Sequence, residues 1–160
     1  MERSQQGEAK SNLKGLYTAE RAYKGEHDAF EADLTRVGWR PERGNRYAYF
    51  LTESGPVLHQ SQPPPDGKPA PYSIVTQDVA KYGGEEWLRP ADTGCAVTPG
   101  KDDAGGVHQL GLTARGFVAL AARKDRGDAR FDCWSIASME RTSATGERIA
   151  AGEPHHELER

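Results

Sequence analysis

Apolar side chains recur at helical spacing near the start of the chain. Over residues 3–24, which contain no proline, the spacings among them include three, four and seven positions. The apolar positions are Ala9, Leu13, Leu16, Tyr17 and Tyr23. Such intervals place side chains on one face of an α-helix. Because glycine commonly follows the last helical turn, the pattern predicts one long amphipathic helix that ends at Gly25.

Short apolar runs separated by turn-forming residues follow the helix. Residues 46–51 are rich in aromatic side chains and predict a strand. Residues 116–122 and 131–137 predict two more strands, and the polar residues 123–128 between them favour an antiparallel hairpin. Residues 72–76 predict a short edge strand. One long helix followed by short antiparallel strands indicates an α+β fold, with the helix packed on a small antiparallel sheet.

Irregular segments connect these elements. Five prolines between residues 60 and 71 predict a loop, and residues 82–106 are rich in Gly, Pro, Asp and Thr. The stretch from Thr142 onward is polar, so we expect a loop-rich C-terminal region that is extended or frayed. Between the helix and the first strand the expected buried positions are Phe30, Leu34, Val37 and Trp39.

Length and composition limit the class of protein. A chain of 160 residues suits one domain, and a hydrophobic content of 36% implies a small core. With 21 Lys and Arg against 24 Asp and Glu, the net charge is −3, which argues against a strongly basic nucleic-acid-binding protein. The longest apolar run covers 117–122, far short of the roughly 20 residues of a membrane span.

Cys95 and Cys133 are the only cysteines. A redox pair, a nucleophile and a structural disulfide are the possible interpretations, and the loop-rich composition favours the disulfide. Closing a loop of this length stabilises a fold by roughly 4 kcal/mol in the chain-entropy model. A disulfide would also place the chain outside the reducing cytosol.

Four segments carry a family resemblance. Residues 8–23 resemble the part of the long type IV pilin helix that follows its membrane-spanning half. Residues 37–49 (Val-Gly-Trp-Arg-Pro-Glu-Arg-Gly-Asn-Arg-Tyr-Ala-Tyr) are similar to a motif of one pilin subgroup associated with surface motility. Residues 132–136 (Asp-Cys-Trp-Ser-Ile) resemble a strand of that subgroup, and residues 152–154 (Gly-Glu-Pro) resemble its C-terminal segment.

The resemblance implies a structural protein without an active site. Its partners would be further copies of itself in a helical filament and the pilus assembly machinery, with adhesion and twitching or gliding motility as the functions of the fibre. A pseudopilin of a type II secretion system is the alternative, and an enzyme is a remote one. The expected location is the cell surface, with an inner-membrane pool of the full-length subunit.

The leader and the apolar half-helix of pilins have no counterpart in this sequence. We therefore expect a soluble headgroup domain over 1–160, in which 1–25 form the C-terminal half of the pilin helix and 26–160 the globular part. Membrane contact would occur only through the missing half-helix. Pilins often close their C-terminal loop with a disulfide, although the subgroup motif has Val where this chain has Cys133.

A basic stretch within the resembling segment is a candidate contact site. It consists of Arg36, Arg40, Arg43 and Arg46. One interpretation is a surface for DNA, polysaccharide or another polyanion, and the other is ion pairing with a neighbouring subunit or with Glu31 and Asp33. Because aromatic residues do not alternate with the basic ones, we favour the subunit contact over nucleic acid.

A metal site is a second possibility, at the hairpin turn. Asp125, Asp128 and Asp132 could supply oxygen ligands to Ca²⁺. Pseudopilins hold calcium in a C-terminal acidic loop, which supports this reading. Interleaved basic residues oppose it, so a solvated turn without a cofactor is the expectation.

Four sequence matches to enzyme motifs are incomplete. Ser11 and Lys14 match a penicillin-binding pattern without its other elements, and Asp92-Thr93-Gly94 matches an aspartic protease motif without the apolar residues that precede it. His156-Glu157 lacks the second histidine of a zinc site, and 94–101 depart from the spacing of a phosphate-binding loop. We therefore predict no catalytic residue.

Overall fold

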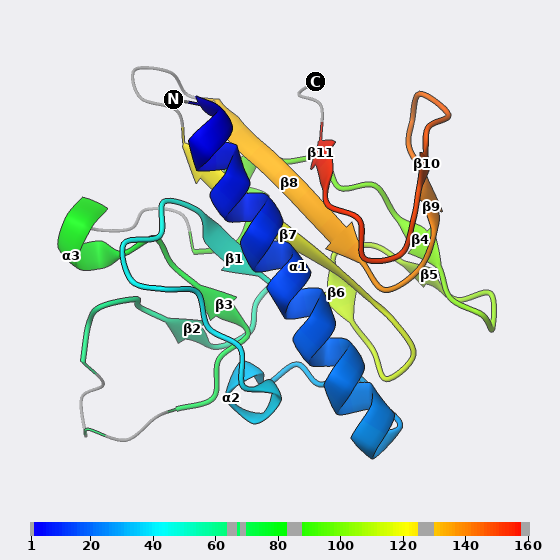
Figure 1. Ribbon diagram of the computed structural model, residues 1–160, viewed down its shortest axis with the longest axis horizontal. Coiled ribbons are helices and arrows are strands. Elements are labelled where there is room, and N and C mark those ends of the chain that lie inside the picture. The colour runs from blue at the N-terminus through cyan, green and yellow to red at the C-terminus, as the bar shows by residue number, and fades with distance from the viewer. Residues whose placement is uncertain (1, 64–66, 68–69, 83–87, 125–129, 158–160) are drawn as a thin grey trace.

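A long helix, α1 (Glu2–His27), lies across one face of a β-sheet in the computed structural model of the chain (Figure 1). The structure describes all residues except 1, 64–66, 68–69, 83–87, 125–129 and 158–160. The other elements are α2 (Leu34–Val37), β1 (Ala48–Phe50), β2 (Val57–Leu58), β3 (Ile74–Val75), α3 (Val79–Tyr82), the 3₁₀ turn η1 (Pro90–Thr93), β4 (Gly100–Lys101), β5 (Val107–His108), β6 (Gly111–Leu112), β7 (Phe117–Lys124), β8 (Phe131–Ala137), β9 (Arg141–Thr142), β10 (Arg148–Ile149) and β11 (His155–Glu157). The predicted α+β class and the long N-terminal helix are confirmed.

The main sheet has the strand order β11-β8-β7-β1-β3-β2, and β6 also pairs with β7. The predicted hairpin is present as β7 and β8, which pair antiparallel from Val118 opposite Ala137 to Lys124 opposite Phe131. Regular pairing in the first predicted strand covers only β1, although its flanking residues Tyr47 and Leu51 are buried. Strands β4 and β5, and β9 and β10, form two separate small hairpins.

Both faces of the central strand β7 are buried, which explains its continuous apolar sequence. Phe117, Ala119 and Ala121 belong to the core beneath α1, where they meet the apolar stripe of the helix. Leu120 and Ala122 point to the opposite face, into a second cluster that contains Cys133. The alternation follows from the two-residue period of a strand.

The helix does not stop at Gly25, so this part of the prediction is wrong. It continues to His27, whose ring stacks on Tyr23 with 4.1 Å between ring centroids. The chain turns away at Asp28, which has φ 62°, and its N–H donates to the Lys24 carbonyl at 2.7 Å. Asp tolerates this left-handed conformation better than most residues, and the Tyr23–His27 pair stabilises one more turn.

The predicted strand at residues 72–76 is present as β3, but it is not an edge strand, so that part of the prediction is wrong. It lies between β1 and β2, and its pairing with β2 is parallel while the other pairs of the main sheet are antiparallel. The sheet is therefore mixed. Strand β2 forms the edge next to β3. The chain turns back after β1 through residues 52–55, and the Thr52 hydroxyl in this turn is 2.6 Å from the hydroxyl of Ser73, just before β3.

The C-terminal segment, as described through Glu157, is extended rather than frayed, which is one of the two expected alternatives. After the β9–β10 hairpin, β11 pairs antiparallel with β8 and forms the other edge of the sheet. Buried Glu157 holds it there, because its carboxylate accepts hydrogen bonds from the Thr98 N–H at 2.8 Å and the Ser135 hydroxyl at 2.7 Å.

Among the residues that the structure describes, no helix has the length and apolar character needed to cross a membrane.

Candidate functional site

The loop before β1 carries most of the basic stretch. Hydrogen bonds to the segment after β3 hold its backbone in place. Gly44 has φ +89°, and its N–H donates to the Asp78 carboxylate at 2.6 Å. The buried Asn45 side chain donates to the carbonyls of Tyr47 at 2.9 Å and Thr76 at 2.8 Å. The Gly-Asn pair of the resembling motif therefore closes the loop onto the segment after β3.

Asp78 is the acceptor that organises this closure. The Ser61 hydroxyl donates to it at 2.6 Å, and the N–H groups of Ala80 and Lys81 cap α3 on the same carboxylate. The Ser61 hydrogen bond, followed by the backbone hydrogen bonds, holds the pKa of Asp78 below its usual value. The carboxylate therefore stays ionised and keeps its donors at ordinary pH.

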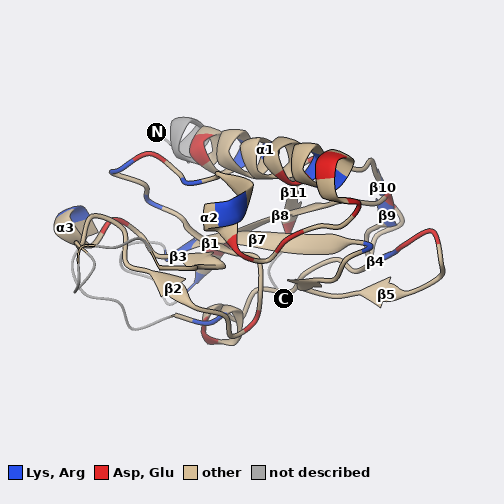
Figure 2. Cartoon of the chain, turned by 90° about the horizontal axis from the view of Figure 1, so that it is seen from below, with Lys and Arg blue, Asp and Glu red and all other residues tan. Residues whose placement is uncertain are grey.

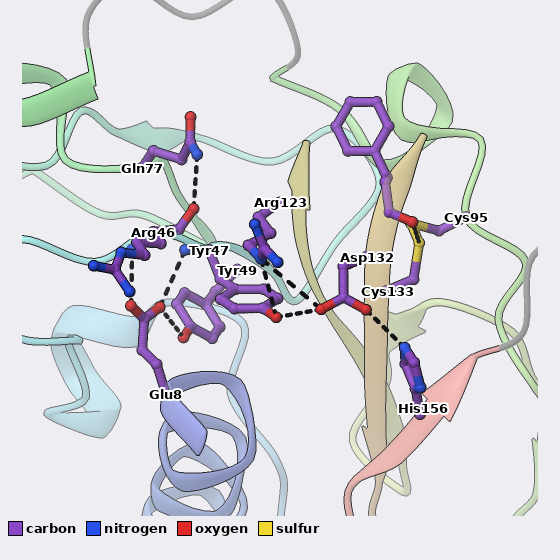
Figure 3. A network of polar contacts seen from close by, with 11 residues as sticks. Glu8, Arg46, Tyr47, Tyr49, Gln77, Cys95, Arg123, Asp132, Cys133 and His156 are labelled. Atoms are coloured by element: carbon purple, nitrogen blue, oxygen red, sulfur yellow. Dashed lines mark hydrogen bonds and ion pairs between the residues drawn. A yellow bond between two sulfur atoms is a disulfide. The ribbon is translucent and has the colours of Figure 1, made fainter. Parts of the chain in front are cut away.

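Glu8 of α1 anchors the other end of the loop (Figure 3). Its two carboxylate oxygens accept the Arg46 N–H at 2.8 Å, the Tyr47 N–H at 3.1 Å and the Tyr49 hydroxyl at 2.9 Å. The Asn12 amide, one helical turn further along, also donates to the Tyr49 hydroxyl at 2.9 Å. Burial, and then the nearby Glu8 charge, raise the pKa of Tyr49 well above its usual value, so the hydroxyl remains a donor.

A second branch of this network crosses the sheet to the C-terminal strand. The Tyr47 hydroxyl donates to Asp132, whose other carboxylate oxygen is 2.6 Å from Nε2 of His156 (Figure 3). Nε of Arg123 is 3.9 Å from Asp132. Polar contacts therefore connect α1, β1, β8 and β11.

Asp132 is thus occupied by protein groups. Asp125 and Asp128, the other two calcium candidates, lie outside the described residues. Within the described part of the chain, no group of three or more His, Cys, Asp or Glu side chains is placed to hold a metal ion.

The four arginines of the basic stretch have different surroundings. Arg36, on α2, is 3.2 Å from the Glu31 carboxylate. Nε of Arg40 donates to Gln60 at 2.8 Å, and Nε of Arg46 donates to the Tyr82 hydroxyl at 3.1 Å. Arg43 is exposed and has no hydrogen bond or ion pair in the structure as described.

The structure brings three of these arginines to one loop beside α3. Figure 2 shows the basic colour on this loop and on α3, which carries Lys81. We call Arg40, Arg43 and Arg46 the basic loop. Arg36 lies apart from it, on α2. The side chains of Arg40 and Arg43 are exposed, so they are available to a charged partner.

The disulfide fastens the segment that covers the far face of the sheet. Cys95 and Cys133 are bonded, with their Cα atoms 6.0 Å apart, and both belong to the cluster on that face. Three residues beyond Cys95, Thr98 contacts Glu157 through its N–H and, at 2.9 Å, its hydroxyl. Two attachments therefore hold the segment after η1 to β8 and β11.

The residues that matched enzyme motifs lie on the helix surface or take part in hydrogen bonds that hold the fold. Ser11 and Lys14 are exposed on α1. Asp92 accepts the Arg89 N–H at 3.1 Å at the start of η1, and Glu157 is buried among Thr98 and Ser135.

Sequence reasoning did not single out Glu8, Asn45 or Asp78, although these residues fix the basic loop. Glu8 had a signal that could have been used, since it shares one flank of the apolar stripe with Asn12 at an interval of one helical turn. Asn45 lies within the resembling motif, although its role was not inferred, and Asp78, far away in the sequence, had no signal.

The described features agree with comparisons to known proteins. A long helix is hydrogen-bonded to a Gly-Asn-Arg-Tyr loop and packed on a small sheet, as expected of a pilin. The family model for the type IV pilin PilA matches residues 1–122, and the chain belongs to this family. It is 28% identical over 169 aligned residues to the type IV major pilin protein PilA of Myxococcus xanthus (strain DK1622), covering 96% of this chain and 76% of the relative.

Proposed function

We propose that the chain is a structural subunit of a type IV pilus and that the basic loop contacts a neighbouring subunit. The family match over residues 1–122 supports the first part. The observation that carries the second part is the basic loop itself. Exposed Arg43 has no hydrogen bond or ion pair in the described structure, and the guanidinium of exposed Arg40 donates to the neutral amide of Gln60.

The support beneath the loop suits it to such a contact. Glu8, Asn45 and Asp78 fix its backbone, so a partner would meet arginines that are already positioned and would lose little conformational freedom on binding. Arg36 contributes least, since Glu31 already neutralises it. Nucleic acid is not favoured, because aromatic side chains such as Tyr47 and Tyr49 are buried in the core and offer no stacking surface.

The wider role follows from the family and forms part of this proposal. The filament would be a homopolymer at the cell surface that serves adhesion and motility. Assembly machinery and an inner-membrane pool of the full-length subunit would supply it. No observation favours the pseudopilin or the enzyme, and the pilin family is a family of structural proteins.

Reversing the charge of the basic loop should impair filaments without unfolding the domain. In cells that make the full-length subunit, we expect Arg40→Glu with Arg43→Glu to reduce the yield of sheared surface filaments at least several-fold. Exposed ion pairs contribute only ~0–1 kcal/mol to a monomer. The melting temperature of the purified domain should therefore move by no more than a few degrees.

A matched control is Arg115→Glu, because Arg115 is also exposed and pairs with exposed Asp103 at 3.8 Å. This variant tests charge reversal at a similar surface site outside the basic loop, and filament yield should stay normal. Normal filament yield from the Arg40, Arg43 variant would contradict the proposed contact. So would a large drop in its melting temperature, since the arginines would then stabilise the fold itself.

A further inference from the structure

A carboxylate lies on the buried face of α1. Glu20 continues the stripe formed by Ala9, Leu13 and Leu16, and its exposed fraction is 0%. At this position the helix packs beside the connection from α1 to α2, residues 28–33. An ionised carboxylate that loses its water is costly unless hydrogen bonds or opposite charges replace the water.

The protein replaces that water only in part. One oxygen of Glu20 accepts the Glu31 N–H at 2.9 Å, while the other oxygen is buried and has no hydrogen-bond partner in the described structure. This single hydrogen bond joins the helix to the middle of the α1–α2 connection. The neighbouring Phe30 N–H is bound to the Ala114 carbonyl at 3.1 Å, so the connection is held from two sides.

The charged groups around Glu20 do not compensate its charge. Glu31 brings a second carboxylate from the connection. That carboxylate is contacted by Arg36 of α2 at 3.2 Å and by the Tyr23 hydroxyl of α1 at 3.4 Å. On α1, the Lys24 ammonium lies over the Phe30 ring, 4.7 Å from its centroid.

A further neighbour of the connection is the turn between β6 and β7. Its cation, Arg115, is directed to Asp103 and is 66% exposed. Arg36 and Arg115 are thus paired with other carboxylates, and the charge that acts on Glu20 is the like charge of Glu31.

We propose that Glu20 makes the joint between α1 and α2 sensitive to pH: the joint is closed when the carboxyl is protonated and opens locally when it ionises. Burial raises the pKa of Glu20 to about 7; the hydrogen bond from the Glu31 N–H opposes the rise, and the Glu31 charge adds to it. The change therefore falls near neutral pH. The inference does not depend on the subunit contact proposed above.

The sign follows from linkage. The carboxyl has a higher pKa in the closed joint than in an opened joint, where it regains a value near 4.5. Protonated Glu20 therefore stabilises the joint below about pH 4.5, and this stabilisation is lost as the pH rises toward 7. With these two values, the opening equilibrium should increase roughly 100-fold between pH 4.5 and pH 8.

Amide hydrogen exchange of the 160-residue chain, measured residue by residue by NMR, tests the proposal. The protection factors of the Phe30 and Glu31 amides should fall roughly 100-fold from pH 4.5 to pH 8. The Leu120 amide, in the central strand, reports on global unfolding, in which Glu20 also regains its ordinary pKa. Opening of the joint alone is therefore shown by Phe30 and Glu31 amides that are less protected than Leu120 at both pH values. Equal protection of Phe30 and Glu31 at both pH values would overturn the proposal.

Two variants separate Glu20 from other carboxyl groups. Glu20→Gln keeps the hydrogen-bond acceptor and cannot ionise, so the protection of Phe30 and Glu31 should lose its pH dependence. Glu26→Gln removes an exposed carboxyl from the same helix and should behave as the wild type. Persistent pH dependence in the Glu20→Gln variant would assign the effect to another group.

Direct titration of the wild-type carboxyl keeps the proposal testable if the variant does not fold. The carbon-13 chemical shift of the Glu20 carboxyl should have its midpoint near pH 7. A midpoint below pH 5 would overturn the proposal.

Discussion

Removing the Cys95–Cys133 disulfide should lower the free energy of unfolding by about 4 kcal/mol, because it closes a loop of 38 residues. For a domain of this size, that corresponds to a decrease in melting temperature of roughly 10 °C. Reduction also frees the segment after η1, which weakens the contacts of Thr98 with Glu157. Thermal unfolding followed by circular dichroism, with and without reductant, measures the effect.

A variant with both Cys95→Ala and Cys133→Ala is the control. It should melt near the temperature of the reduced wild type and should not respond to reductant. Unfolded, non-reduced wild type should contain no thiol that reacts with a labelling reagent. Two reactive thiols per chain, or a double variant as stable as the oxidised wild type, would show that the disulfide does not stabilise the fold.

Glu8→Ala is expected to destabilise the fold strongly, because Glu8 lies on the flank of α1 that faces the basic loop. It leaves the Arg46 and Tyr47 N–H groups and the Tyr49 hydroxyl without their shared acceptor. Hydrogen bonds to a charged group contribute roughly 1.5–3 kcal/mol each and are not additive, so we expect a loss of about 3–4 kcal/mol. Chemical denaturation of the purified domain measures this loss.

Two comparisons make the Glu8 result specific. Glu26→Ala removes a carboxylate of the same helix whose side chain is 79% exposed, and the expected change is within about 0.5 kcal/mol. Glu8→Gln keeps a single acceptor oxygen and should fall between wild type and Glu8→Ala. Equal stability of the Glu8→Ala and Glu26→Ala variants would mean that the three donors find water instead.

The elements with long periodic patterns were predictable from the sequence. Apolar residues at intervals of three and four defined α1, and two apolar runs around a polar turn defined β7 and β8. The same stripe contained a signal that we did not use. Glu20 follows Leu16 by four residues and so continues the buried stripe of the helix. An acidic residue at such a position predicts a buried carboxyl group.

The apolar runs 46–51 and 72–76 located the short strands β1 and β3. Strands β2, β4, β5 and β6 were not located, because two residues carry no measurable period. The parallel pairing of β2 with β3 depends on how the chain returns after a long loop. The position of β11 depends on the bonds of Glu157 to Thr98 and Ser135, which come from distant parts of the sequence.

The candidate sites also depend on contacts between residues that are far apart in the sequence. Asp132 is close to Asp125 and Asp128 in sequence, which suggested a shared cation. In the folded chain Asp132 is directly opposite Arg123 across the hairpin and within hydrogen-bonding reach of Tyr47 from a third element. The subunit contact by the basic loop is still a prediction, since a single copy of the chain contains no partner.

The anchoring of the basic loop by Glu8 has a consequence for how this surface can evolve. Two of the three donors to Glu8 are peptide N–H groups, which every residue except proline possesses. The side chain at position 46 can therefore change while the anchor persists, and the same holds for the exposed positions 40 and 43. The surface that the basic loop offers to a neighbouring subunit can therefore change its charge while the fold is kept, provided that the acidic residue on the helix remains.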